Sequence, residues 1–161
     1  MKTIDQWLEE YGESHRNKTN KLIHWICVPT ILFTVLGLFA SIPSAGLFNW
    51  VPVQLSVLAN WGGVIVVLGL LFYLRLSWVM ALGMGIITVA MMYGVREVAK
   101  IHLAPLWAIC LGIFVVAWIF QFIGHKIEGK KPSFFKDLQF LMIGPAWLLG
   151  FVYRKIGLKY S

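Results

Sequence analysis

Charged residues are scarce in this chain of 161 residues, since Asp, Glu, Lys and Arg together make up only 13%. Soluble domains carry about 25% of such residues, so the composition argues against an ordinary water-soluble globule. The formal net charge of +7 can indicate nucleic-acid binding, but here the basic residues lie in groups that flank apolar runs. We therefore expect a membrane protein and no nucleic-acid partner.

Cysteine is also rare, and both Cys27 and Cys110 lie inside apolar runs. We expect two free thiols that pack as small hydrophobic side chains, because nothing in their spacing indicates a disulfide framework or a paired-cysteine metal site. The sequence contains no G-x-S-x-G motif, no phosphate-binding loop and no cysteine nucleophile motif. Any chemistry must therefore come from other residue types.

Apolar stretches dominate the rest of the chain. Four of them have 18 or 19 residues, close to the ~20 that cross a bilayer core as a helix, and they cover 24–42, 55–73, 76–93 and 105–123. A fifth stretch, 138–153, is shorter and carries Gly144-Pro145 in its middle, which predicts a re-entrant or broken helix. The expected fold class is an all-α integral membrane protein with four transmembrane helices.

The first twenty residues predict an N-terminal interfacial helix and a cap. Apolar residues recur at helical spacing from Ile4 to Tyr11, which predicts a helix over 3–16, and Thr19 or Asn20 is suited to cap the first span. Residues 124–137 form the predicted site loop of a single membrane domain, 1–161. With a cytoplasmic N-terminus, only Arg96 and Lys100 of the basic residues lie outside, which is the positive-inside pattern.

Histidine is the residue type most suggestive of chemistry. The predicted topology places His15, His24 and His125 at one membrane face, and leaves His102 as a solvated residue in a loop on the other side. On an unbroken helix, nine residues at ~100° each would put His15 and His24 on opposite faces. A break at residues 17–20 removes this obstacle, so that both imidazoles can share a metal with His125.

Two further groups of residues surround this candidate site. His125 and Glu128 are spaced i, i+3, the spacing used in helical carboxylate metal sites; such ligands suit Fe(II) and would also fit zinc, although a solvated pair has the same spacing. Basic side chains could attract a carboxylate head group or could serve only as topology signals; they are Lys21, Lys126, Lys130 and Lys131.

Two segments resemble a known family. They are "YGESHRNKTNKLIHWICVP" near the beginning and "QFIGHKIEGKKPSFFKDLQFLMIGP" towards the end. The sequence is similar here to small membrane proteins related to the fungal 2-hydroxy fatty acid dioxygenase of phytosphingosine breakdown. The two segments cover a little over a quarter of the chain but enclose most of it.

This resemblance implies an iron(II)-dependent dioxygenase in fatty acid α-oxidation, which shortens a 2-hydroxy long-chain fatty acid by one carbon with O₂. It also implies roles for individual residues. His15, His24 and His125 match the family histidines, which would be catalytic and metal-binding, and Glu128 matches the acidic position. Asn17 and Asn20 match motif positions from which they could orient the imidazoles.

Other functions stay open at this stage. A non-enzymatic small membrane protein would use the histidines as polar anchors, a bis-histidine haem protein would use two of them, and a zinc-dependent lipid hydrolase would lack an evident nucleophile. The expected location is a bacterial inner membrane or an endoplasmic reticulum. The sequence gives no basis for an oligomeric state.

Overall fold

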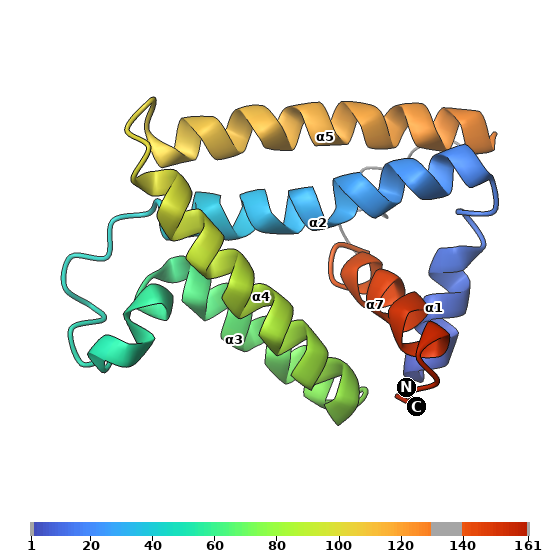
Figure 1. Ribbon diagram of the computed structural model, residues 1–161, viewed down its shortest axis with the longest axis horizontal. Coiled ribbons are helices and arrows are strands. Elements are labelled where there is room, and N and C mark those ends of the chain that lie inside the picture. Colours follow the sequence, from blue (N-terminus) through green and yellow to red (C-terminus); the bar gives the residue numbers. More distant parts are fainter. Residues whose placement is uncertain (1, 130–139, 161) are drawn as a thin grey trace.

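The computed structural model describes residues 2–129 and 140–160, and all regular elements in these ranges are helices. In chain order they are α1 (Ile4–Gly12), α2 (Lys18–Ala40), the 3₁₀ helix η1 (Val53–Leu58), α3 (Trp61–Leu74), α4 (Trp78–Ala99), α5 (Leu106–Glu128) and α7 (Ile143–Lys155) (Figure 1). The expected all-α class is confirmed for the described part of the chain.

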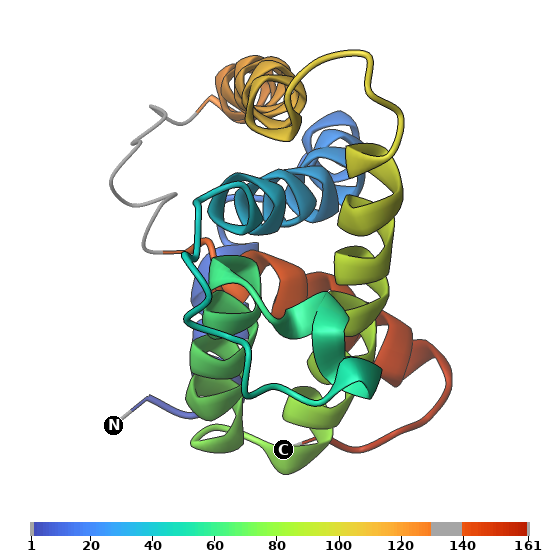
Figure 2. The ribbon, with the colours of Figure 1, turned by 90° about the vertical axis from the view of Figure 1, so that its left-hand side faces the viewer.

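The two longest helices, α2 and α5, run antiparallel and side by side (Figure 1). Figure 2 shows that α2 lies between α5 on one side and the α3–α4 hairpin on the other. Glycine allows a close approach at both ends of the pair. A Cβ atom added to Gly37 would lie 2.4 Å from Cys110 Sγ, and one added to Gly124 would lie 2.4 Å from Asn20 Oδ1. The second of these close contacts fixes α2 against α5 beside two histidines.

Three helices are long and apolar enough to cross a membrane, namely α2, α4 and α5. They contain most of the expected spans 24–42, 76–93 and 105–123, and they carry many exposed apolar side chains, as lipid-facing helices do. The two cysteines are free and buried, as expected.

The second expected span, 55–73, is not one helix. Its first residues belong to η1, and α3 begins only at Trp61, where Asn60 Oδ1 accepts a hydrogen bond from the Gly63 amide at 3.2 Å. A Cβ at Gly63 would lie 2.0 Å from the Leu58 carbonyl oxygen, so the chain turns sharply between the two elements. With 14 residues, α3 is about 21 Å long, which is shorter than a ~30 Å bilayer core.

The helices next to the candidate site begin and end at other residues than the sequence predicts. α1 ends at Gly12, so it is shorter than the expected 3–16. α2 begins at Lys18, because Asn17 adopts an extended conformation and its side chain accepts hydrogen bonds from the amides of Thr19 and Asn20. The N-cap is therefore Asn17, and the expectation of Thr19 or Asn20 is wrong.

The last described helix, α7, packs against α1 and α4. Its first eight residues are all buried, so it belongs to the core of the protein. Pro145 lies in its first turn, where a missing amide breaks no intrahelical hydrogen bond. Within the expected broken element 138–153, residues 143–153 thus form one continuous helix and 140–142 form a turn, while 138 and 139 lie outside the described residues.

A hydrogen bond from Tyr73 ties α3 to the start of α7, because its hydroxyl donates to the Met142 carbonyl. Tyr73 is only 2% exposed, so Tyr73→Phe leaves that carbonyl without its donor at a cost of about 1–3 kcal/mol. We predict that Tyr73→Phe lowers the thermal unfolding midpoint in detergent by about 2–4 °C for each kcal/mol of stability that is lost.

The matched control for this substitution is Tyr93→Phe, because Tyr93 is 48% exposed. Its free energy of unfolding should change by no more than about 0.5 kcal/mol, as is usual for surface substitutions. Its unfolding midpoint should therefore stay close to that of the wild type. Equal shifts in the two variants would contradict a specific role for Tyr73.

Candidate metal centre

Three histidines from distant parts of the chain lie together in the interior. His15 follows α1, His24 lies in the second turn of α2, and His125 lies in the last turn of α5. Their side chains are only 3%, 1% and 5% exposed. The ring centroids are 4.2 Å apart for His15–His24, 5.0 Å for His24–His125 and 5.5 Å for His15–His125. One ligand atom from each residue lies within 4.8 Å of the others, which makes this group a candidate metal centre.

Backbone contacts fix the tautomer of two of these imidazoles. Nδ1 of His15 lies 2.7 Å from the Tyr11 carbonyl oxygen, and Nδ1 of His24 lies 3.0 Å from that of Asn20. A carbonyl oxygen only accepts hydrogen bonds, so each Nδ1 carries the proton and each Nε2 carries the lone pair. Metal-binding histidines usually have this arrangement, in which the second nitrogen donates to the backbone.

The break between α1 and α2 allows His15 and His24 to face one another. It covers residues 13–17, here called the α1–α2 linker, so it begins earlier than the expected 17–20. Within it the His15 amide still donates to the Gly12 carbonyl at 3.0 Å, after which Asn17 turns extended with ψ of 133°. The linker therefore turns the chain after His15, so that α2 runs in a different direction from α1 (Figure 1).

Two aromatic side chains pack against the ring of His15. The Tyr11 ring stacks on His15 with centroids 4.3 Å apart and an interplanar angle of 17°. Trp147 from α7 lies 5.3 Å from both rings, and both aromatic side chains are buried. The Tyr11–His15 spacing of four residues could have indicated the stacking, whereas no sequence signal places Trp147 here.

Glu128 lies beside the cluster, but its carboxylate faces the α1–α2 linker. Oε1 accepts hydrogen bonds from the amides of Arg16 at 2.8 Å and Asn17 at 3.2 Å. Oε2 accepts from the Asn17 amide at 2.9 Å and from Asn20 Nδ2 at 3.0 Å. Among the described residues, the group suited to a metal contains the three histidines and does not include Glu128. The sequence did not predict these backbone partners.

The two predicted supporting asparagines both contact the site. Asn17 caps α2 and donates its amide to Glu128. Asn20 is fully buried, its carbonyl accepts from His24, and its side-chain nitrogen donates to the Ser14 carbonyl at 3.0 Å, next to His15. Asn20 thus contacts His24 directly, whereas the hydrogen bonds of Asn17 lead to Glu128, Thr19 and Asn20.

The predicted head-group lysines have different positions. The Lys21 ammonium lies over the ring of Phe151, 5.3 Å from its centroid, and 6.0 Å from that of Trp147, so it links α2 to α7. Lys126 is exposed on α5. Lys130 and Lys131 lie outside the described residues, and His102 is exposed in the loop between α4 and α5.

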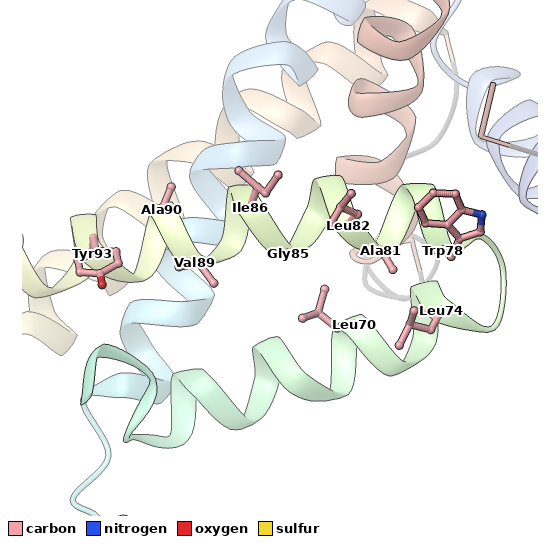
Figure 3. A pocket seen from close by; sticks show the side chains of 10 residues that line it. All are labelled: Leu70, Leu74, Trp78, Ala81, Leu82, Gly85, Ile86, Val89, Ala90 and Tyr93. Atoms are coloured by element: carbon pink, nitrogen blue, oxygen red, sulfur yellow. The ribbon is translucent and has the colours of Figure 1, made fainter. Parts of the chain in front are cut away.

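Two cavities among the described residues bear on the candidate centre, one by its size and one by its position. The larger, of about 780 Å³, is an apolar groove between α3 and α4 that extends from Trp78 to Tyr93 (Figure 3). None of its lining residues belongs to the helices that carry the histidines, so it is separate from the candidate centre. A second cavity lies beside Tyr11 and Gln121 and holds about 20 Å³, which is room for roughly one water molecule.

The histidine cluster has the ligand set that a metal needs. Two imidazole nitrogens that bind one ion at 2.0–2.1 Å are at most about 4.2 Å apart. The ligand atoms of the three histidines lie within 4.8 Å of one another, so a movement of less than about 1 Å would bring them to metal-binding distance. Imidazole suits Fe, Zn, Cu and Ni, and three neutral ligands leave open positions on the ion.

Fold and site together define a class, that of helical membrane proteins with a buried three-histidine cluster suited to a metal ion. The family follows from comparison with known proteins. The family model described as "2-hydroxy-palmitic acid dioxygenase Mpo1-like" matches residues 1–156, and the chain belongs to this family.

A curated relative supports the assignment and the resemblance seen in the sequence. The chain is 30% identical over 150 residues to the "2-hydroxy-palmitic acid dioxygenase MPO1" of Saccharomyces cerevisiae, an alignment that covers 91% of this chain and 78% of the relative. No solved structure matches the chain.

Removal of any one of the three imidazoles should abolish tight metal binding. We predict that the purified wild-type protein binds Co²⁺ or Fe²⁺, and that His15→Ala, His24→Ala and His125→Ala each weaken binding by more than about 100-fold, since even supporting residues are worth 10–100-fold. Metal titration followed by visible spectroscopy measures this. His102→Ala is the control and should bind as the wild type does; three variants with unchanged affinity would contradict the site.

The close contact at Gly124 predicts a second effect. A methyl group in Gly124→Ala would meet Asn20 Oδ1 and push α5 away from α2, and such overpacking costs about 1–3 kcal/mol. Metal affinity should fall by about 5- to 150-fold if that cost falls on the bound state. The control is Gly112→Ala on the same helix, where an added Cβ meets no atom within 4 Å. Equal affinities for the two variants would count against the contact.

Proposed function

We propose that this protein is an Fe²⁺-dependent dioxygenase that shortens 2-hydroxy long-chain fatty acids by one carbon, a reaction of fatty acid α-oxidation. The observation that carries the proposal is the buried cluster of His15, His24 and His125 in a chain of the Mpo1-like family. The relative's name supplies the substrate and reaction class, and the cluster supplies residues that could perform it.

The overall reaction is chemically balanced with O₂ alone. A 2-hydroxy acid and one O₂ give the acid that is one carbon shorter, CO₂ and water, so no other reductant or oxidant is required. When bound, Fe²⁺ would supply redox chemistry with O₂ and coordination positions for the hydroxyl and carboxylate oxygens of the substrate. The donor set of three neutral imidazoles leaves such positions open.

The chain's own residues would prepare this site in three ways. The Tyr11 and Asn20 carbonyls hold the Nδ1 protons of His15 and His24, which makes the Nε2 atoms of both rings the candidate ligand atoms. The rings of Tyr11 and Trp147 cover His15 and limit the access of water. The apolar helices allow the acyl chain to stay in lipid while the head group reaches the site.

The packing of the three rings argues against a bis-histidine haem protein. A porphyrin bound by two histidines must lie between their rings. Here the His15 and His24 centroids are 4.2 Å apart, and the ring of His125 lies 5.0 and 5.5 Å from them. The adjacent cavity holds about 20 Å³, which is far too small for a macrocycle.

A product assay tests the proposed function. We predict that purified protein in detergent or nanodiscs, supplied with Fe²⁺, O₂ and 2-hydroxypalmitic acid, forms the C15 acid, as detected by mass spectrometry. Each of the three histidine-to-alanine variants should lose more than about 99% of this activity, because its metal site is incomplete.

One control tests whether the reaction needs the 2-hydroxyl group, and a second tests whether it needs the three clustered histidines. Palmitic acid without the 2-hydroxyl group should not be consumed, because it lacks one of the two chelating oxygens, and His102→Ala should retain activity. If no 2-hydroxy acid of any chain length is consumed by protein that contains iron, the proposed function is wrong. A Soret band in the purified protein would instead favour haem.

A further inference from the structure

The position of Glu128 is unusual for an acidic residue. It is the last residue of α5, where the negative end of the helix dipole disfavours a carboxylate by a few tenths of a kcal/mol or more. Its carboxylate compensates by lying at the N-terminal end of α2, where backbone amides have no partner within the helix. The negative end of one helix thus supplies a charge to the positive end of another.

The hydrogen bonds of Glu128 occupy both of its oxygens. They come from the amides of Arg16 and Asn17 and from the side chain of Asn20, at 2.8–3.2 Å. A carboxylate has about four lone-pair positions, and four contacts are present. Glu128 would have to give up some of these contacts in order to bind a metal ion.

Each group that Glu128 contacts is connected to one of the histidines. Arg16 directly follows His15 in the linker. Asn20 accepts the Nδ1 proton of His24 through its carbonyl and donates its side chain to the Ser14 carbonyl. His125 lies three residues before Glu128 on the same helix. A single carboxylate therefore joins the three chain segments that carry the cluster.

We propose that Glu128 is a positioning residue and not a metal ligand: its carboxylate holds the α1–α2 linker on the end of α5 and so sets the distances between His15, His24 and His125. This inference rests on the metal site of the proposed function. It replaces the expectation from the sequence that Glu128 completes the ligand set. The histidines are then arranged before the metal arrives.

Two measurements on Glu128→Gln test the proposal. The first is a Co²⁺ titration, in which we expect about 10- to 100-fold weaker binding and visible absorption bands at unchanged wavelengths, because the ligands stay the same. The second is hydrogen exchange of the metal-free protein, in which the amides of Arg16 and Asn17 should exchange faster while α4 is unaffected. Glutamine retains one acceptor oxygen but has an NH₂ group in place of the other, and this group cannot accept a hydrogen bond from the linker amides.

Two further variants separate the role of Glu128 from general effects. Glu128→Asp retains the charge on a shorter side chain, so its Co²⁺ affinity should lie between those of the wild type and Glu128→Gln. Glu97→Gln is the matched control, because Glu97 is an exposed carboxylate that pairs with Lys100 at 2.6 Å, and both measurements should match the wild type. If Glu128→Gln fails to fold, Glu128→Asp must still show faster exchange at the two linker amides.

The outcomes are distinct. Shifted Co²⁺ bands in Glu128→Gln would show that the carboxylate is a ligand and would overturn the proposal, as would wild-type exchange at both linker amides or wild-type metal affinity. Protein that binds Co²⁺ as expected but consumes no 2-hydroxy acid would refute the proposed function and leave this inference intact. If the wild type binds no metal, the proposed function fails, and hydrogen exchange alone decides whether Glu128 holds the linker.

Discussion

The contact between Asn20 and Gly124 is the constraint on which the rest of the site depends. With no side chain at Gly124, the two longest helices approach closely enough for a buried asparagine to fill the space between them. A larger residue there would separate the helices at the level of His24 and His125. The distance between His24 and His125 therefore requires this close packing of the α2 and α5 backbones, in addition to the contacts that Glu128 makes with the linker.

The scarce polar groups of this chain are concentrated where helices end. Backbone amides at the start of α2 and the carbonyls near the end of α1 need partners that apolar side chains cannot provide. Asn17 and Glu128 satisfy the amides, His15 Nδ1 donates to the Tyr11 carbonyl near the end of α1, and His24 Nδ1 donates to the Asn20 carbonyl in the first turn of α2. The same hydrogen bonds thus complete the backbone and orient the candidate ligands, which explains how so apolar a protein can bury several polar side chains together.

Local patterns in the sequence predicted the features that depend on neighbouring residues. Long apolar runs identified three helices that could cross a membrane, and the polar break after α1 indicated that His15 and His24 could face one another. The division of 55–73 into η1 and α3 was missed because it depends on a tight turn at Gly63 that hydropathy does not record. The contacts of Trp147 and Glu128 were missed because they join residues more than 100 positions apart.

The histidines also come from opposite ends of the chain, and this affects how the protein is made. His15 and His24 leave the ribosome before His125 and Glu128, which follow only after η1, α3 and α4 have been synthesised. At roughly 5–20 residues per second, the two early imidazoles wait for several seconds before their partners exist. The cluster can therefore form only after α5 has been synthesised, so any metal ion that it holds would bind late in biosynthesis.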